Sequence, residues 1–467
     1  MYKKIQHLHF VGIGGIGMSG IAEILLNLGY RISGSDLSRN ANVKRLEGLG
    51  AVIHTGHDAD HIAGADAVIR SSAVTEKNPE IIQARKRHIP VVRRAEMLAE
   101  LMRLKYGIAI AGAHGKTTTT SLVATILGEA GVDPTVINGG IVNALGSNAK
   151  HGLGEYLVTE ADESDGSFLK LTPTIAVVTN LDREHMEHYG SYRAIRQAFR
   201  GFVDKVPFYG LAVLCRDHPD VKAMLKHLGD KRVVTYGFSK RSDYQAIELK
   251  QKEGDIYFKV AYRLHGQGKP ELLGDIRLAL PGRHNVGNAL AAIAVARELE
   301  IDWQVIQSAI RHFKGVQRRF SRLLDTPERV VIDDYAHHPT EISATLKAAR
   351  KGYGRERRLV AFFQPHRYSR VGDHLKAFQS CFRSADLVMV DPIYEAGETR
   401  PSEGPLKDGG QKVLVEGIRK RSRTVVHALP EGEGWREALE RHLNPGDLVL
   451  FLGAGDVSRK AHQFAGL

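Results

Sequence analysis

The stretch GIAIAGAHGKTTTT, residues 107–120, decides the fold of the middle of this chain. Its apolar start predicts a buried strand, and the run from Lys116 predicts the first turn of a helix. The loop between them is a shortened phosphate-binding loop, with two residues between its glycines where the full motif has four. In such loops backbone N–H groups surround phosphate oxygens, a lysine neutralises the transferred phosphoryl group and a threonine can hold Mg²⁺. The sequence therefore predicts an ATP and Mg²⁺ site at Gly112, Ala113, His114, Gly115, Lys116, Thr117 and Thr118.

A second glycine-rich turn lies close to the N-terminus. The segment HLHFVG predicts a strand, residues 18–28 predict a helix, and GIGGIG between them fits the pattern G-x-G-x-x-G. Asp36 follows Gly17 by 19 residues. Glycines at these positions let the backbone approach a diphosphate, and an acidic residue at this distance can accept a hydrogen bond from a ribose hydroxyl. The motif alone is compatible with NAD, with UDP and with a tight turn that binds no ligand.

Length and composition describe an ordinary globular chain. Its 467 residues suggest three domains, at roughly 150 residues for each domain. The net charge of +12 is compatible with a nucleic-acid partner or with a basic surface on an enzyme of anionic substrates. We favour the second interpretation and expect no nucleic-acid partner, because no nucleic-acid-binding motif accompanies the charge. No apolar run approaches the roughly 20 residues of a membrane span, and the two cysteines are far apart. We therefore expect a cytoplasmic protein without membrane insertion.

Acidic residues follow two further predicted strands of the middle region. Glu160 ends the strand EYLVTE, and the segment NLDREH, which ends at His185, follows the strand AVVTN. Carboxylates at the carboxyl ends of parallel strands, close to a phosphate loop, are well placed to bind Mg²⁺. His185 could bind a second Mg²⁺ or orient a carboxylate, whereas a lone histidine is more often structural.

The segment PGRHNVGN, residues 281–288, precedes an alanine-rich helix. Asn285 and Asn288 are three residues apart and therefore share one face of that helix. Asparagine favours helix starts, so the pair could cap the helix. The two side chains could also contact the edge of an adenine, and the spacing does not distinguish these roles.

Many motifs, in order, resemble those of the Mur ligase family over nearly the whole chain. They are GIGGIGMSG, SSAV, AGAHGKTTTT, EADESDGSF, NLDREHMEHY, PGRHNVGNALAA, GVQRRF, DDYAHHPTEI, FQPHRYSR and GAGDVS. The resemblance implies an α/β protein of three domains. These are a Rossmann-like UDP-sugar domain (1–105), a central P-loop ATPase domain with a mixed sheet (106–320) and a Rossmann-like amino-acid-binding domain (321–467).

The resemblance also implies a reaction. The expected enzyme is an ATP-dependent ligase that joins L-alanine to the lactyl carboxylate of UDP-N-acetylmuramate through an acyl phosphate, in cytoplasmic peptidoglycan precursor synthesis. It would act as a monomer or homodimer. Four alternatives stay open at this point: a ligase that recycles a whole tripeptide onto the same UDP-sugar, a polyglutamylating folate ligase, a P-loop regulator without a product, and a nucleic-acid-binding ATPase.

Residue roles carried over from the family fall into four groups. The catalytic and Mg²⁺-binding group comprises Lys116, Thr117, Glu160 and His185, with the remaining ligands of a second Mg²⁺ left open. The ATP-binding group adds to the phosphate loop His284, Asn285, Asn288, Arg319 and Asp334. The UDP-sugar group comprises Gly14, Gly15, Ile16, Gly17, Met18, Asp36, Ser71 and Ser72. The amino-acid group comprises Tyr335, His338, Arg367 and Arg370.

Overall fold

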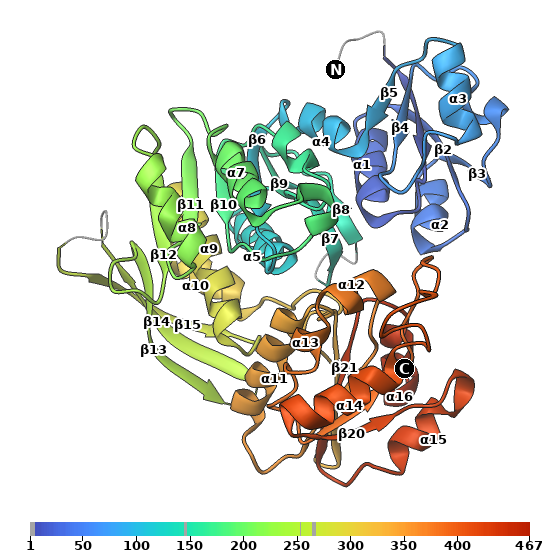
Figure 1. Ribbon diagram of the computed structural model, residues 1–467. Coiled ribbons are helices and arrows are strands. Elements are labelled where there is room, and N and C mark those ends of the chain that lie inside the picture. The colour runs from blue at the N-terminus through green and yellow to red at the C-terminus, as the bar shows by residue number, and fades with distance from the viewer. Residues whose placement is uncertain (1–4, 144–146, 253, 264–267) are drawn as a thin grey trace. The chain divides into compact units, whose positions relative to one another are not determined.

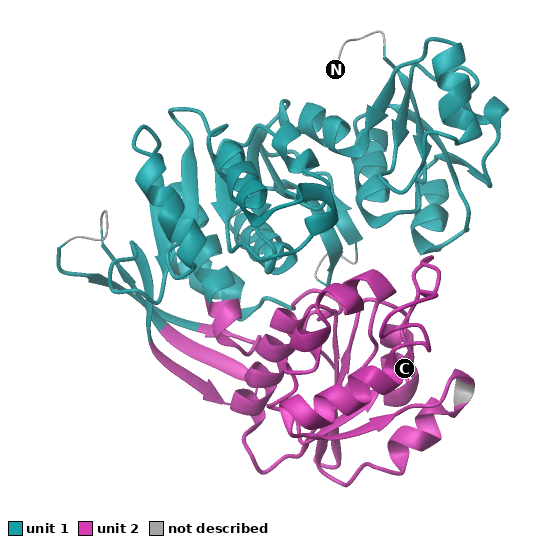
Figure 2. Cartoon of the chain, in the orientation of Figure 1, with its two compact units in different colours: residues 1–247, 259–276, 287–314 teal, residues 248–258, 277–286, 315–467 magenta. Residues whose placement is uncertain are grey.

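Three β-sheets, each accompanied by helices, follow one another along the chain (Figure 1). A computed structural model describes residues 5–143, 147–252, 254–263 and 268–467. By residue contacts the chain divides into two compact units (Figure 2). The first unit contains residues 1–247, 259–276 and 287–314, and the second contains residues 248–258, 277–286 and 315–467. The first two sheets thus belong largely to one unit, although the motifs along the sequence indicate three domains.

The first sheet is parallel throughout and has the strand order β3-β2-β1-β4-β5. Its strands are β1 (His7–Val11), β2 (Arg31–Asp36), β3 (Val52–Thr55), β4 (Ala67–Arg70) and β5 (Val91–Arg93). Its helices are α1 (Ile16–Asn27), α2 (Ala41–Gly48), the short η1 (Ala59–Ile62), α3 (Pro79–Lys86) and α4 (Arg94–Met102). The order of the strands reverses between β1 and β4, and ligands of open α/β sheets bind at such a reversal.

The second sheet is mixed and has β6 (Tyr106–Ala111) near its middle, between β10 (Ile175–Val178) and β9 (Tyr156–Glu160). Its other strands are β7 (Thr135–Val142), β8 (Ser147–Lys150), β11 (Leu211–Cys215), β12 (Val233–Gly237), β13 (Tyr244–Lys252), β14 (Asp255–Tyr262) and β15 (Glu271–Leu278). The accompanying helices are α5 (Lys116–Glu129), η2 (Ser167–Lys170), α6 (Met186–Tyr189), α7 (Tyr192–Val203), α8 (Pro219–Met224), η3 (Leu225–His227), α9 (Arg283–Glu298) and α10 (Trp303–Arg311). Because β7 and β8 pair antiparallel while β6 pairs parallel with both neighbours, the predicted mixed sheet is confirmed.

The third sheet has the order β16-β17-β21-β18-β19-β20, and its pairs are parallel except for β16 with β17. Its strands are β16 (Ser321–Asp325), β17 (Arg329–Asp334), β18 (Leu359–Phe363), β19 (Leu387–Val390), β20 (Val425–Ala428) and β21 (Asp447–Leu452). Its helices are α11 (Pro339–Tyr353), α12 (Tyr368–Asp373), α13 (Leu375–Phe378), α14 (Gln411–Ser422), η5 (Gly432–Gly434), α15 (Trp435–Glu440) and α16 (Val457–Ala465). The α/β class predicted from the sequence is confirmed.

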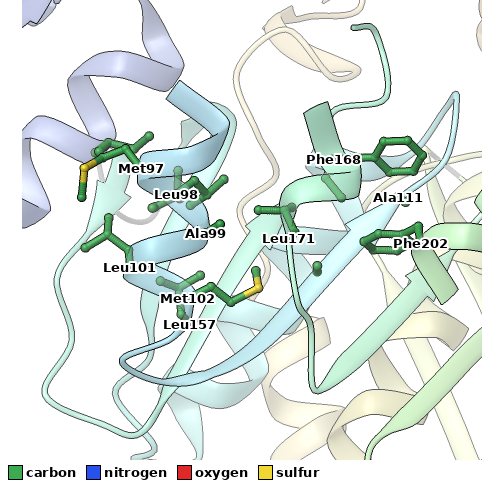
Figure 3. Close-up of a cluster of buried hydrophobic side chains, with 14 of the residues drawn as sticks. Met97, Leu98, Ala99, Leu101, Met102, Ala111, Leu157, Phe168, Leu171 and Phe202 are labelled. Atoms are coloured by element: carbon green, nitrogen blue, oxygen red, sulfur yellow. The ribbon is translucent and has the colours of Figure 1, made fainter. Parts of the chain in front are cut away.

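One hydrophobic core is shared by the first two sheets (Figure 3). Helix α4 contributes Leu98 and Met102, β9 of the second sheet contributes Leu157, and the short helix η2 contributes Phe168. All four side chains are almost fully excluded from water. Truncation of such a residue to alanine typically destabilises a protein by about 2–5 kcal/mol. This continuous core explains why the contacts join the two sheets into one unit.

Among the residues that the structure describes, we find no helix that combines the length and the apolar character needed to cross a membrane.

Candidate active site

The first glycine-rich turn connects β1 to α1 and is held by Asp36 at the end of β2. The backbone N–H of Gly14 donates to Asp36 Oδ2 at 2.8 Å, and the Asn42 side chain donates to the carbonyl of Gly14 at 2.9 Å. A Cβ atom on Gly14 would lie 2.9 Å from Asp36 Oδ2, so a larger residue would disturb this bond. Asp36 therefore shapes the turn, and its carboxylate oxygens can accept further bonds from a ribose.

The other residues predicted to bind the UDP-sugar lie around the same turn. Ser71 and Ser72 follow β4, at the point where the strand order reverses, and the N–H of Ser71 donates to the carbonyl of Val11. Ile16 is 45% exposed, whereas the side chain of Met18 is buried in the core. Only the backbone of Met18 is therefore available to a ligand.

A buried carboxylate behind this turn was not singled out from the sequence. Glu80, at the start of α3, is fully buried and accepts hydrogen bonds from Ser35 Oγ at 2.7 Å and His61 Nδ1 at 2.9 Å. His57 Nδ1 lies 3.2 Å from the carboxylate and His9 Nε2 lies 3.7 Å from it. Burial disfavours the charge of Glu80, but its interactions with His9, Ser35 and His61 outweigh burial and lower its pKa to about 2.

This network reaches the glycine-rich turn through the backbone of Ser35. The carbonyl of Ser35 accepts hydrogen bonds from the N–H groups of Gly12 and Ile13, at 2.8 and 3.0 Å. Glu80 therefore fixes, through the Ser35 side chain, the residue on which the turn rests. The sequence does contain several histidines around β1 and η1, which could have indicated a buried acidic partner. Glu80 itself could not be identified in this way, because it is more than forty residues from Ser35 in the sequence.

The phosphate loop connects β6 to α5 as predicted, and it rests on the end of β10. Gly112 and Gly115 have φ angles of +137° and +87°, which glycine adopts without strain. The N–H of His114 donates to Asn180 Oδ1 at 2.8 Å, and Thr179 Oγ1 donates to the carbonyl of His114 at 2.7 Å. The loop is therefore held in its shape by side chains of the neighbouring strand, which the sequence motif did not reveal.

Lys116 lies among carboxylates at the start of α5. Its Nζ donates to both carboxylate oxygens of Glu163, at 2.9 and 2.8 Å, and to the carbonyl of Gly112 at 2.6 Å. Burial disfavours the ammonium form, but Glu163, Asp162 and Glu160 outweigh burial and raise the pKa of Lys116 above its ordinary value. Lys116 is therefore a permanent cation, as the neutralisation of a phosphoryl group requires.

Asp162 belongs to the acidic loop that follows β9, residues 160–165, and connects this loop to the first glycine-rich turn. Its carboxylate lies 3.1 Å from the guanidinium of Arg94, the first residue of α4. A Cβ atom on Gly17 would lie 3.1 Å from the same guanidinium. Arg94 thus places a positive charge between the glycine-rich turn and Asp162, in the segment that follows β9. Sequence reasoning missed Arg94, because it is 68 residues from its partner.

His185 belongs to a cluster of oxygen and nitrogen ligands within the first unit. One ligand atom each of Glu163, Glu184 and His185 lie within 4.8 Å of one another. Asp182 lies 3.0 Å from the His114 ring of the phosphate loop. Carboxylate and hydroxyl oxygens are the ligands that Mg²⁺ prefers. The carboxylates of Glu163 and Glu184, beside His185, therefore fit Mg²⁺ chemically. The predicted ligands Thr117 and Glu160 lie in the first turn of α5 and at the end of β9.

The residues at the start of α9 have different surroundings. Asn288 packs against the phosphate loop, since a Cβ atom on Gly115 would overlap with its Oδ1. The Asn285 side chain donates to the carbonyl of Pro281 at 2.8 Å. A helix cap would instead accept a hydrogen bond from a backbone N–H, so this contact does not distinguish the capping role from the adenine role. The His284 side chain is exposed.

Within the second unit, Asp334 ends β17 and holds the backbone just before β16 and just after β17. It accepts hydrogen bonds from the N–H groups of Phe320 and Ala336, both at 2.8 Å. Burial raises the pKa of Asp334 to about 6, although the neighbouring Arg319 opposes that shift. The guanidinium groups of Arg318 and Arg319 lie 4.7 and 5.0 Å from the ring centre of Tyr335.

The residues predicted to bind the amino acid follow β17 and β18 in this unit. Arg367 is exposed, with a φ angle of +67°, and directly precedes α12, which contains Arg370. An Arg370 Nη atom lies 3.1 Å from His366 Nδ1. Burial, Arg370 and Arg367 lower the pKa of His366 to about 4, so this neutral ring accepts the hydrogen bond. His338 is buried, and its ring contacts that of His374 edge-on.

Comparisons with known proteins agree with this arrangement. Residues 7–106 match the family model of the "Mur ligase family, catalytic domain". Residues 110–296 match the "Mur ligase middle domain", and residues 318–455 match the "Mur ligase, glutamate ligase domain". The chain is 62% identical over its whole length to a UDP-N-acetylmuramate–L-alanine ligase of Magnetococcus marinus, of which it covers 98%.

Two solved structures are also similar to the chain. A UDP-N-acetylmuramate-alanine ligase of Thermotoga maritima has a TM-score of 0.81 and 32% identity, with 98% of each chain covered. A murein peptide ligase of Psychrobacter arcticus has a TM-score of 0.71 and 25% identity, with 98% of this chain and 97% of that chain covered.

Proposed function

Because the chain belongs to the Mur ligase family, we propose that it is an ATP-dependent ligase that joins L-alanine to the lactyl carboxylate of UDP-N-acetylmuramate. The observation that carries the proposal is the 62% identity, over the full length, to a relative named for that reaction. The cationic Lys116 in a phosphate loop between carboxylates supports it chemically. The reaction belongs to peptidoglycan precursor synthesis, and its place in the cell would be the cytoplasm.

The chemistry proceeds in two steps. A lactyl carboxylate oxygen attacks the γ-phosphorus of ATP, which forms an acyl phosphate and releases ADP. The amine of alanine then attacks the acyl carbon, the C–O bond to phosphate breaks, and the amine loses a proton as the amide forms. ATP is needed because a carboxylate is a poor electrophile, and the protein contributes position and charge neutralisation.

The phosphate loop, with Gly112, Gly115 and Lys116, would hold the β- and γ-phosphates. Mg²⁺ would be bound by Thr117, Glu160 and His185, and when bound it neutralises phosphate charge. The adenine and ribose of ATP would be bound by the residues that the family motifs indicate. These are His284, Asn285, Asn288, Arg319 and Asp334.

The two substrates would use the other groups of residues. The glycine-rich turn with Asp36, Ser71 and Ser72 would bind the UDP-sugar, and Arg94 supports this by adding a positive charge beside Gly17. Tyr335, His338, Arg367 and Arg370 would bind alanine, since a guanidinium can hold both oxygens of a carboxylate. We propose domains at 1–105, 106–320 and 321–467, and a monomer or homodimer in solution.

A ligase that attaches a tripeptide to the same UDP-sugar is the main alternative, because the murein peptide ligase shares the fold. A phosphate-release assay with ATP, UDP-N-acetylmuramate and either L-alanine or the tripeptide alanyl-glutamyl-diaminopimelate distinguishes the two. We expect phosphate release with alanine to be far faster, at equal concentrations. Faster release with the tripeptide would replace the proposed function with the alternative.

A further inference from the structure

The side chain of Lys116 is fully engaged within the first unit. An ammonium group has three hydrogens to donate. Those of Lys116 are directed to the carbonyls of Gly112 and Ala113, at 2.6 and 3.3 Å, and to the two oxygens of Glu163. The Glu163 side chain is only 5% exposed. A phosphate oxygen can therefore bind Lys116 closely only if one of these contacts is given up.

Glu163 is the contact best able to give way. The two carbonyls belong to the loop that would surround the phosphate, so their positions are fixed by the loop itself. The backbone of Glu163 is also fixed, because its carbonyl accepts bonds from Tyr189 Oη at 2.5 Å and from the N–H of Gly166 at 3.1 Å. Its carboxylate, at the end of a side chain with three rotatable bonds, can turn while the backbone stays in place.

The neighbouring carboxylates of the same loop have other contacts. Glu160 Oε1 accepts a hydrogen bond from the N–H of Gly139 at 2.7 Å, and Asp162 pairs with Arg94. Asp165 is exposed and caps the turn at Ser167. Among the acids of this loop, Glu163 is thus the one whose charge is matched directly by the phosphate-loop lysine.

A buried carboxylate that loses its cation is strongly destabilising unless another cation replaces the first. Phosphates that take over Lys116 would place negative charge close to Glu163. A cation that meets Glu163 there would also meet Glu184 and His185, since ligand atoms of the three residues lie within 4.8 Å of one another. The geometry therefore indicates that Glu163 can lose its contact with Lys116 when a divalent cation binds to Glu163 in its place.

We propose that Glu163 is a positioning residue for Lys116, and that it exchanges the lysine ammonium for a divalent cation when ATP binds. The inference rests on the proposed function, since it requires ATP to bind at this loop. Glu163 would make the binding of ATP and of Mg²⁺ cooperative, because ATP bound without the metal leaves the buried carboxylate unpaired.

Glu163→Gln tests the exchange in the full-length protein. Calorimetric titrations measure the Kd for ATP with MgCl₂ and, in a second series, with EDTA. In the wild type we expect Mg²⁺ to tighten ATP binding strongly. In the variant, ATP without Mg²⁺ should bind more tightly than to the wild type, and the tightening by Mg²⁺ should fall about tenfold, which corresponds to about 1.4 kcal/mol.

Two further variants serve as controls. Asp165→Asn removes the same charge from the same loop without touching Lys116, and its Mg²⁺ effect should stay within about twofold of the wild type. Glu163→Asp keeps the charge, so it should retain most of the Mg²⁺ effect even if Glu163→Gln folds poorly. A purely structural role for Glu163 would lower the melting temperature and change both Kd values of the glutamine variant by the same factor.

An unchanged Mg²⁺ effect in Glu163→Gln, beside normal ATP binding by the wild type, would overturn the exchange and leave the proposed function intact. Failure of the wild type itself to bind ATP would instead refute the proposed function. The two failures are therefore distinguishable in one set of titrations.

Discussion

Replacing the buried Glu80 by glutamine should destabilise the first sheet in a pH-dependent way. The carboxylate accepts hydrogen bonds from Ser35 and His61, and the structure lowers its pKa from 4.5 to about 2. Each pH unit of such a shift corresponds to about 1.4 kcal/mol, so the charged form contributes roughly 3 kcal/mol to folding. Glu80→Gln keeps the shape of the side chain and removes that contribution at pH 7.

The sign of the pH dependence follows from the direction of the shift. A lowered pKa stabilises the folded state above the unfolded pKa of 4.5, and the stabilisation is lost as the pH falls toward 2. The difference between wild type and Glu80→Gln should therefore shrink by about 1 kcal/mol at pH 4 and by about 2 kcal/mol at pH 3. Below pH 2 the two proteins should be nearly equal in this respect.

Hydrogen exchange measured by mass spectrometry on peptides from β1 and β2 reports the local free energy of opening. Rates at each pH are corrected for the intrinsic exchange rate. Glu76→Gln is the matched control, because Glu76 is half-exposed and pairs with Arg70 and Arg85 at the surface, where ion pairs contribute about 0–1 kcal/mol. A loss below 1 kcal/mol in Glu80→Gln at pH 7, or a loss that does not change with pH, would refute the reasoning.

Three further predictions concern the reaction. Lys116→Ala should lower the ligation rate by about 10³-fold or more, because the γ-phosphoryl group loses its cation; near-normal phosphate release by the folded variant would contradict this role. Gly115→Ala should raise the KM for ATP by at least about tenfold, since the added Cβ meets Asn288 Oδ1 at a φ of +87°. Gly128→Ala, in open space on α5, is its control and should leave that KM unchanged. Arg370→Ala should raise the KM for alanine by about tenfold while the KM for ATP stays constant; equal changes in both would argue against an alanine contact.

The sequence predicted those parts of the molecule that depend on local pattern. Buried strands such as β1, β6 and β10 are mostly apolar runs, and both glycine-rich loops contain the glycines whose positive φ angles the turns require. The strands β5 and β8, of three and four residues, are too short to carry a comparable pattern and were not predicted.

Contacts between distant segments were the other part that could not be predicted. Lys116 contacts Glu163 because β9, which precedes Glu163, lies beside β6, which precedes Lys116. The local sequence around each residue does not predict which strands are neighbours in the sheet. Arg94 with Asp162 and Ser35 with Glu80 depend on spatial order in the same way. The roles proposed for the predicted site residues stay predictions until substrates are tested.

The continuous core beneath α4 has a practical consequence for dissecting this enzyme. A fragment that ends near residue 105 would retain Met97, Leu98 and Met102 but lose Leu157 and Phe168, against which that core is built. The apolar side chains of α4 would then be exposed to solvent, and this surface would favour self-association of the fragment over ligand binding. Work on the first sheet without the rest of the chain would need a longer piece that keeps β6 to β12 of the second sheet, such as residues 1–247, or solubilising substitutions on α4.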